Sequence, residues 1–353
     1  MQIVFSDRQL VHRPRQYGVH GRLVAPVENA SRAETLLARL ASLGLSHREP
    51  DDVGLAAITA VHTEDYVRFL AGAWPRFQAL KNAGPEVLPN VHPYLSQPSG
   101  HSGGGARRKL RATGILAEAG WYIGDLSCAM GERTHEAVHA SAMSAASAAD
   151  LVLAGAPSAF ALCRPPGHHA YADRASGFCF LNNAAIAAQR LRQAYAKVAM
   201  IDFDTHHGDG TQTIFYERGD VFVGSVHTDP GEYYPFYLGY GDERGIGEGE
   251  GCNLNIPLPF GANDAAYVAG VEKLVEAAVT FGAQALVVSA GWDAHRDDPL
   301  SRLDVGDAAY PAIGALIGRM NLPTVIVQEG GYSLPAVATS APAFVEAFLE
   351  ASR

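Results

Sequence analysis

Three residues of this chain could together hold a metal ion. Asp204 and His206 are separated by one residue, and Asp293 lies further along the chain. Two carboxylates and one imidazole suit zinc, and three protein ligands leave one coordination position open for water or substrate. We therefore expect one zinc ion per chain at these residues. The simpler alternative is that Asp204 and His206 only cap the helix that follows them.

Two adjacent histidines, His168 and His169, could transfer protons beside such a metal. Asp202 and Asp209 flank the predicted metal ligands. Each carboxylate could bind the far nitrogen of one histidine and set its tautomer. Without a metal nearby, a pair of structural histidines would be the better interpretation.

Tyr332 is a candidate for stabilising negative charge on a reacting carbonyl oxygen. It follows Gly330 and Gly331, and this hinge favours an exposed, directed side chain. Its hydroxyl could donate a hydrogen bond to a developing oxyanion. The alternative is an ordinary core tyrosine.

These polar segments each follow an apolar run that predicts a buried strand. The four runs are residues 158–163, 198–203, 285–289 and 324–327, and further strands are predicted at 2–5 and 221–226. Helices are predicted at about 134–153, 182–195, 264–281 and 307–319. Strands that alternate with helices predict an α/β fold with an open parallel sheet covered on both faces. Ligands bind beyond the carboxyl ends of such strands, so the polar segments should meet at one edge.

Two features lie outside this alternating pattern. Ser31 and Glu34 form a capping-box pattern that predicts the start of an amphipathic helix. Residues 83–107 contain four prolines and a Gly103–Gly105 run, which predict a long irregular loop. Since no low-complexity tract or polar linker divides the chain, we expect residues 1–353 to form one domain with this loop as an insertion.

Composition argues against several classes of protein. The net charge of -10 disfavours nucleic acid as a partner, because phosphate binding needs a basic surface. We expect no membrane segment, since no apolar run reaches the roughly 18 residues that a spanning helix needs. The four cysteines form no Cys-x-x-Cys pair, and the N-terminal residues lack a signal-peptide pattern. A cytoplasmic protein is expected.

At these motifs the sequence resembles the histone deacetylase superfamily, which has the arginase–deacetylase fold. The motifs are RPPGHHA (164–170), GFCFLNNAA (177–185), DFDTHHGDGTQ (202–212), GWDAHRDDP (291–299) and EGGY (329–332). Within the superfamily the chain is most similar to acetylpolyamine amidohydrolases, and the likeness covers nearly its whole length.

The resemblance implies zinc-dependent hydrolysis of the acetyl amide of acetylated primary amines, with acetylpolyamines as substrates. Peptide acetyl-lysine is the alternative substrate for the same chemistry. His169 would act as general base and then acid, oriented by Asp209. His168, paired with Asp202, would stay largely cationic, and Tyr332 with zinc would polarise the acetyl carbonyl.

The resemblance also implies a substrate channel, structural monovalent cations and a homodimer with the loop at 83–107 in its interface. The channel would be lined by Gly177, Phe178, Tyr234 and Phe236. One K⁺ or Na⁺ would be bound by Asp202, Asp204, His206, Ser225 and the Val226 backbone. A second would be bound by the backbone carbonyls of Phe215, Arg218 and Val221.

The chain departs from the acetylpolyamine pattern at the channel mouth. Two glutamates are expected there, whereas this chain has Leu116 and Ser127 at the aligned positions. Glu118 and Asp125 lie close by, and the sequence leaves open whether either one replaces them.

Two other functions are compatible with parts of the pattern. An arginase-like ureohydrolase would share the fold, but it needs bridging carboxylates for a second metal that are missing after Asp204 and Asp293. A non-catalytic acyl-amine binding protein would be expected to lack Tyr332, a metal ligand or the second histidine, and all of these are present.

Overall fold

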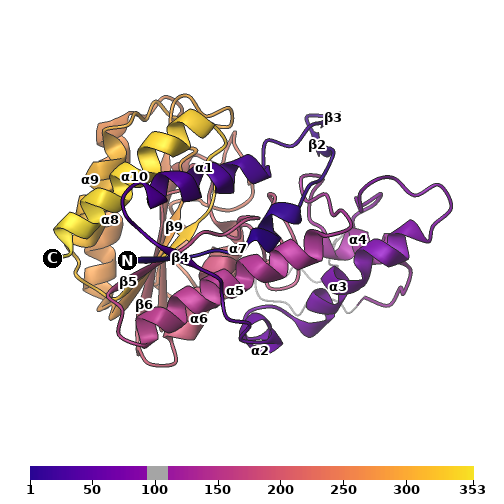
Figure 1. Ribbon diagram of the computed structural model, residues 1–353, viewed down its shortest axis with the longest axis horizontal. Coiled ribbons are helices and arrows are strands. Elements are labelled where there is room, and N and C mark those ends of the chain that lie inside the picture. Colours follow the sequence, from indigo (N-terminus) through magenta and orange to yellow (C-terminus); the bar gives the residue numbers. More distant parts are fainter. Residues whose placement is uncertain (94–109) are drawn as a thin grey trace.

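The computed structural model describes residues 1–93 and 110–353. One eight-stranded sheet runs through this part of the chain, and every pair of neighbouring strands in it is parallel (Figure 1). In spatial order the strands are β4 (His47–Arg48), β1 (Gln2–Val4), β5 (Ser158–Ala161), β10 (Thr324–Gln328), β9 (Ala285–Ala290), β6 (Val198–Asp202), β7 (Val221–Thr228) and β8 (Asn253–Leu258). The predicted α/β fold with a parallel sheet is confirmed.

Helices cover both faces of the sheet, as Figure 1 shows. One face packs against α1 (Ala30–Ala41), α8 (Asp264–Phe281), α9 (Ala309–Gly318) and α10 (Leu334–Ala351). The other packs against α5 (Thr134–Leu153) and α6 (Asn183–Leu191). Side chains alternate between the faces of a strand. In β9, for example, Leu286 and Val288 join the first core and Val287 joins the second.

A smaller group of elements lies beside the sheet and has its own apolar cluster. It contains α2 (Leu55–Thr59), α3 (Glu64–Gln78) and α4 (Ile115–Tyr122). The remaining elements are the antiparallel hairpin of β2 (Tyr17–Val19) and β3 (Arg22–Val24), the 3₁₀ helices η1 (Asp7–Val11) and η2 (Gly247–Gly249), and α7 (Asp209–Phe215).

The predicted capping box at Ser31 is wrong. Helix α1 begins at Ala30, and its N-cap is Asn29, whose side chain accepts a hydrogen bond from the Ser31 backbone N–H at 3.0 Å. Asparagine is as good an N-cap as serine, so the helix starts earlier than the Ser31–Glu34 pattern indicated.

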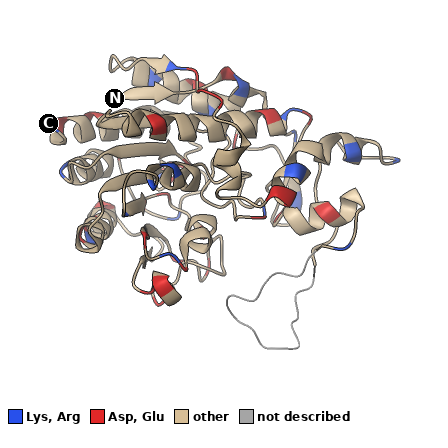
Figure 2. Cartoon of the chain, turned by 90° about the horizontal axis from the view of Figure 1, so that it is seen from below, with Lys and Arg blue, Asp and Glu red and all other residues tan. Residues whose placement is uncertain are grey.

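The predicted loop at 83–107 lies mostly outside the described residues. In its described part, 83–93, Val87 forms an isolated antiparallel bridge with Met130. Acidic and basic residues are interspersed over the helices and loops around the sheet (Figure 2). Within the described ranges, no helix has the length and apolar character needed to cross a membrane.

Candidate metal and catalytic site

The four polar segments leave the sheet at one edge because their strands are neighbours. Strands β5, β10, β9 and β6 are consecutive in the sheet and parallel, so their carboxyl ends lie side by side. Asp202 at the end of β6 is in register with Ser289 of β9. Residues that are far apart in the sequence therefore meet, as the strand-end rule predicts.

Asp204, His206 and Asp293 converge at this edge. Their ligand atoms lie within 4.8 Å of one another, and all three residues are buried. His206 Nδ1 is 3.1 Å from Asp204 Oδ1 and 3.2 Å from Asp293 Oδ2. No other group of three potential ligands comes together in the described part of the chain.

The backbone around these carboxylates has no room for side chains. A Cβ added at Gly291 would lie 2.2 Å from Asp204 Oδ2, and one added at Gly330 would lie 2.2 Å from Asp293 Oδ2. Burial, together with the nearby Asp204 carboxylate, raises the pKa of Asp293 to about 7. Two carboxylates buried this closely repel one another, and a cation between them would relieve that repulsion. The oxygen and imidazole donors therefore fit zinc.

His206 is oriented by Tyr233. The tyrosine hydroxyl donates to the Leu300 carbonyl and lies 2.9 Å from His206 Nε2, so the imidazole must donate its Nε2–H to the hydroxyl. The two rings also stack, with centroids 5.0 Å apart and an interplanar angle of 14°. With Nε2 as the donor to Tyr233, Nδ1 is the ring nitrogen that would hold a metal together with the two carboxylates. Sequence reasoning had given Tyr233 no such role.

The structure brings each predicted histidine–aspartate pair within hydrogen-bonding distance. His168 Nδ1 lies 3.0 Å from Asp202 Oδ2, and His169 Nδ1 lies 2.7 Å from Asp209 Oδ1. The two imidazole centroids are 4.0 Å apart. Both histidines are buried, and each has its Nδ1 within hydrogen-bonding distance of a carboxylate.

The two histidines differ in their electrostatic surroundings. Burial lowers the pKa of His168, but the carboxylates of Asp204 and Asp202 outweigh it and raise the pKa to about 10. Burial and the neighbouring His168 cation lower the pKa of His169 to about 4, despite the opposing effect of Asp209. At neutral pH, His168 is therefore the cation and His169 is the neutral base of the pair.

Two residues that sequence reasoning missed hold this pair in place. Glu329 Oε2 accepts hydrogen bonds from the backbone N–H of Gly167 at 2.6 Å and of His168 at 3.1 Å. Tyr171 donates its hydroxyl to Asp209 Oδ2 at 2.7 Å, so both oxygens of Asp209 are bound. Glu329 is the first residue of the EGGY motif. Its position directly before a glycine pair at a strand end is the sequence feature that could have indicated a role at the site.

Asp298, a second carboxylate to which the sequence analysis gives no role, holds the backbone of Tyr332. Gly331 has φ of 119°, a conformation that favours glycine, and the Tyr332 N–H donates to Asp298 Oδ2 at 2.6 Å. The tyrosine ring meets Phe178 edge to face, with centroids 5.7 Å apart. Burial raises the pKa of Tyr332 well above its usual value, so the hydroxyl stays protonated and can donate.

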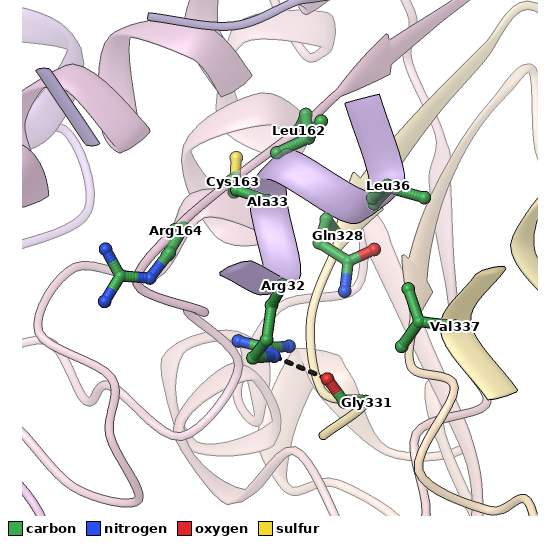
Figure 3. A pocket seen from close by; sticks show the side chains of 9 residues that line it. All are labelled: Arg32, Ala33, Leu36, Leu162, Cys163, Arg164, Gln328, Gly331 and Val337. Carbon is green, nitrogen blue, oxygen red and sulfur yellow. Dashed lines mark hydrogen bonds between the residues drawn. The ribbon is translucent and has the colours of Figure 1, made fainter. Parts of the chain in front are cut away.

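Arg32 binds the backbone of Gly331, the residue before Tyr332 (Figure 3). Its guanidinium donates to the carbonyls of Gly331 at 2.5 Å and Glu329 at 2.7 Å, and it lies 4.5 Å from the centre of the Tyr332 ring. Glu28 forms an ion pair with Arg32 at 2.9 Å, and the same carboxylate also pairs with Arg164 at 2.8 Å. The cavity beside Arg32 has a volume of about 10 Å³, which is room for a single water molecule.

The predicted channel residues surround His169 and Tyr332. A Cβ at Gly177 would lie 2.4 Å from His169 Cδ2, so the glycine backbone rests against the imidazole. The Tyr234 ring is perpendicular to His169, at 89° and 4.9 Å between centroids. Phe236 lies further out, 6.1 Å from Tyr234, and is 46% exposed.

The predicted monovalent-cation residues lie on adjoining elements. Ser225 of β7 is in register with Asp202 of β6, and the Ser225 hydroxyl is 2.8 Å from His227 Nδ1. Val226 follows Ser225 in the same strand. Phe215 ends α7, and Val221 begins β7 after Arg218. Both cation sites stay predictions.

Neither acidic residue near the channel mouth is free. Glu118 forms a two-point ion pair with Arg76, at 2.5 and 3.0 Å. Asp125 accepts hydrogen bonds from Ser127, Gly177 and Tyr234. Neither carboxylate is therefore available as a simple replacement for the two mouth glutamates.

Comparison with known proteins gives full-length matches. The family model described as "Histone deacetylase domain" matches residues 26–348. An acetylpolyamine amidohydrolase of Burkholderia pseudomallei is 45% identical, over 99% of this chain and 98% of that protein. Acetylpolyamine amidohydrolase 1 of Pseudomonas aeruginosa is 39% identical over 100% of both chains. The crystal structure of an acetylpolyamine aminohydrolase from B. pseudomallei superposes with a TM-score of 0.93 at 44% identity, covering 99% of each chain.

Proposed function

The chain belongs to the histone deacetylase family, and on that premise we propose that it hydrolyses the acetyl amide of small acetylated amines, with acetylpolyamines as the favoured class. One observation carries the proposal: a buried metal-ligand triad lies at the same sheet edge as two histidines, each within hydrogen-bonding distance of a carboxylate, and as the Tyr332 turn. The similarity to full-length acetylpolyamine amidohydrolases supports the polyamine class.

We assign the metal to zinc, held by Asp204, His206 and Asp293. When bound, Zn²⁺ supplies Lewis acidity toward water and toward the acetyl carbonyl oxygen. Two carboxylates neutralise the charge of the ion, and the single ligand cluster in the described residues supports one metal rather than the two that an arginase-like enzyme needs.

We assign proton transfer to His169. Its Nδ1–H donates to Asp209, which leaves Nε2 to take a proton from the attacking water and return it to the leaving amine. The lowered pKa of His169 keeps it neutral and able to accept at neutral pH. His168 carries a positive charge beside it and stabilises negative charge that develops on the substrate.

The Tyr332→Phe variant is expected to lose about 10²–10³ in turnover, because it removes one donor to the developing oxyanion. The phenylalanine ring keeps the stacking on Arg32 and the contact with Phe178. Substrate binding should therefore survive, and steady-state kinetics should show a fall in kcat with little change in KM. Wild-type turnover in this variant would show that Tyr332 has another role.

The substrate class is tested by comparing kcat/KM for acetylputrescine or acetylcadaverine with that for an acetyl-lysine peptide at fixed ionic strength. We expect the small amine to be preferred at least tenfold, which corresponds to about 1.4 kcal/mol of differential transition-state binding. The net charge of -10 favours a cationic amine, although salt screens part of that attraction. The bonded state of Glu118 and Asp125 argues against this preference, because neither carboxylate is left free to bind a second ammonium group.

A tenfold preference for the peptide would identify a lysine deacetylase and leave the zinc chemistry intact. Absence of turnover on every substrate, together with binding of acetylated amines, would favour the non-catalytic alternative. We further propose a cytoplasmic homodimer with residues 83–107 at its interface, and structural monovalent cations at the two predicted sites.

A further inference from the structure

We infer that Asp125 is a positioning residue that fastens the two walls of the substrate channel on either side of His169. The inference rests on the proposed function, since it concerns the same channel. Asp125 lies in the segment after α4, and its two carboxylate oxygens make five hydrogen-bond contacts, with Ser127 in the same segment and with two other segments of the chain.

One oxygen of Asp125 binds both channel walls. Oδ2 lies 3.0 Å from the Ser176 hydroxyl, 3.0 Å from the Gly177 backbone nitrogen and 2.8 Å from the Tyr234 hydroxyl. Gly177 belongs to the segment after the histidine pair, and Tyr234 belongs to the segment after β7. The same atom therefore joins two segments that come from different strands.

The hydroxyl hydrogens around this oxygen allow more than one arrangement. Ser176 and Tyr234 are also 2.7 Å from each other, so two hydroxyl hydrogens serve three contacts among Ser176, Tyr234 and Asp125. In either arrangement Tyr234 is bound to the carboxylate directly or through Ser176. Burial raises the pKa of Asp125, but the hydrogen bonds from Ser127, Gly177 and Tyr234 outweigh it and lower the pKa, which favours the ionised acceptor.

The other oxygen of Asp125 contacts the channel wall indirectly, through Ser127. Oδ1 accepts from the Ser127 backbone at 2.8 Å and from its hydroxyl at 2.5 Å. That hydroxyl oxygen in turn accepts from the Phe178 backbone N–H at 3.2 Å. Gly177 and Phe178 have φ of 54° and 66°, and a bulky residue in this region persists only where its surroundings hold it.

The fastened walls contact the proposed general base from two sides. The Gly177 backbone rests on one part of the His169 ring, and the Tyr234 ring meets it edge to face. Phe178 reaches on to Tyr332. Release of either wall would give the His169 imidazole room to move, which would slow proton transfer. It would also widen the channel, which would weaken the preference for slender substrates.

The test uses the zinc-loaded full chain and the Asp125→Asn variant. Asparagine keeps the shape but replaces one accepting oxygen with a donor that faces other donors. We expect kcat/KM for acetylcadaverine to fall about 10–100-fold, mainly in kcat, because small misplacements of catalytic groups have effects of this size. The loss should be smaller for an acetyl-lysine peptide. Zinc content should not change, and the exposed Glu132→Gln change in the next part of the same segment is the matched control.

A double-mutant cycle with Tyr234→Phe separates positioning from general destabilisation. If Asp125 acts through Tyr234, the double variant should lose little more than the worse single variant. Losses that multiply, or an Asp125→Asn loss no larger than that of Glu132→Gln, would overturn the inference.

Hydrogen exchange measures the fastening without any turnover. The Gly177 and Phe178 amides should exchange at least tenfold faster in Asp125→Asn than in the wild type or in Glu132→Gln, and unchanged exchange would refute the inference. If the wild type proves inactive on every acetylated amine, the proposed function fails, while this measurement still decides the role of Asp125.

Discussion

Removal of the proposed zinc is expected to lower turnover by about 10³-fold or more, since the Lewis acidity of a catalytic metal contributes several kcal/mol to transition-state stabilisation. The Asp293→Ala variant should show the same loss. Asp293 supplies one of the two carboxylates that converge with His206, and its removal leaves only two protein ligands. Elemental analysis of the purified protein should give one zinc per chain, and chelation followed by addition of zinc should abolish and then restore activity.

The matched control for this experiment is Asp297→Ala, which removes an exposed carboxylate from the same segment. It should retain both zinc and turnover. Two equivalents of active-site metal in the wild type would point to the ureohydrolase alternative instead. Full activity after exhaustive chelation would exclude the assigned role of the metal.

The parts of the site that the sequence predicted are those that depend on strand order and short spacing. Asp204 and His206 share one loop, and Asp293 leaves a neighbouring parallel strand, so the fold class alone brings them to the same edge. A carboxylate partner for each histidine is predicted by the aspartates that flank the metal loop, and the family resemblance implies the specific pairing of His169 with Asp209.

The parts that the sequence did not reveal depend on contacts between segments with no local signal. Glu329 binds the backbone of the histidine segment, and Asp298 binds the backbone of Tyr332. Backbone N–H groups are the same in every sequence, so nothing in the pattern shows which carboxylate will find them. The sequence leaves open whether Glu118 replaces a mouth glutamate, because its ion pair with Arg76 of α3 depends on packing between two helices.

Strand β8 was missed for a related reason. Its buried Asn253 and Asn255 interrupt the apolar run that normally predicts a strand. Both side-chain NH₂ groups donate to the Gln212 side-chain oxygen, so these buried donors are satisfied by tertiary hydrogen bonds. Strand β4 has only two residues, which is too short to give any periodicity.

The two histidines are expected to respond very differently to substitution. His169→Ala should reduce turnover by about 10²–10⁴-fold, the usual contribution of a positioned general acid or base, and the loss should persist at every pH. His168→Ala should retain measurable activity, because it removes a positive charge but leaves the proton-transfer group and its bond to Asp209 in place. Both variants should keep their zinc, which elemental analysis can check.

The pH–rate profiles provide the sharper distinction between these two roles. The pKa of His169 is lowered to about 4, so the contribution of His169 to wild-type activity should be lost as the pH falls through that region and the imidazole becomes protonated. The pKa of His168 is raised to about 10, so its charge is present below that pH and is lost as the pH rises through it. In His168→Ala the alkaline loss should therefore disappear, and the acid limb should move to higher pH, because the cation that lowers the pKa of His169 is gone. A profile of the same shape as the wild type would mean that His168 does not act through its charge, and the division of roles between the two histidines would have to be abandoned.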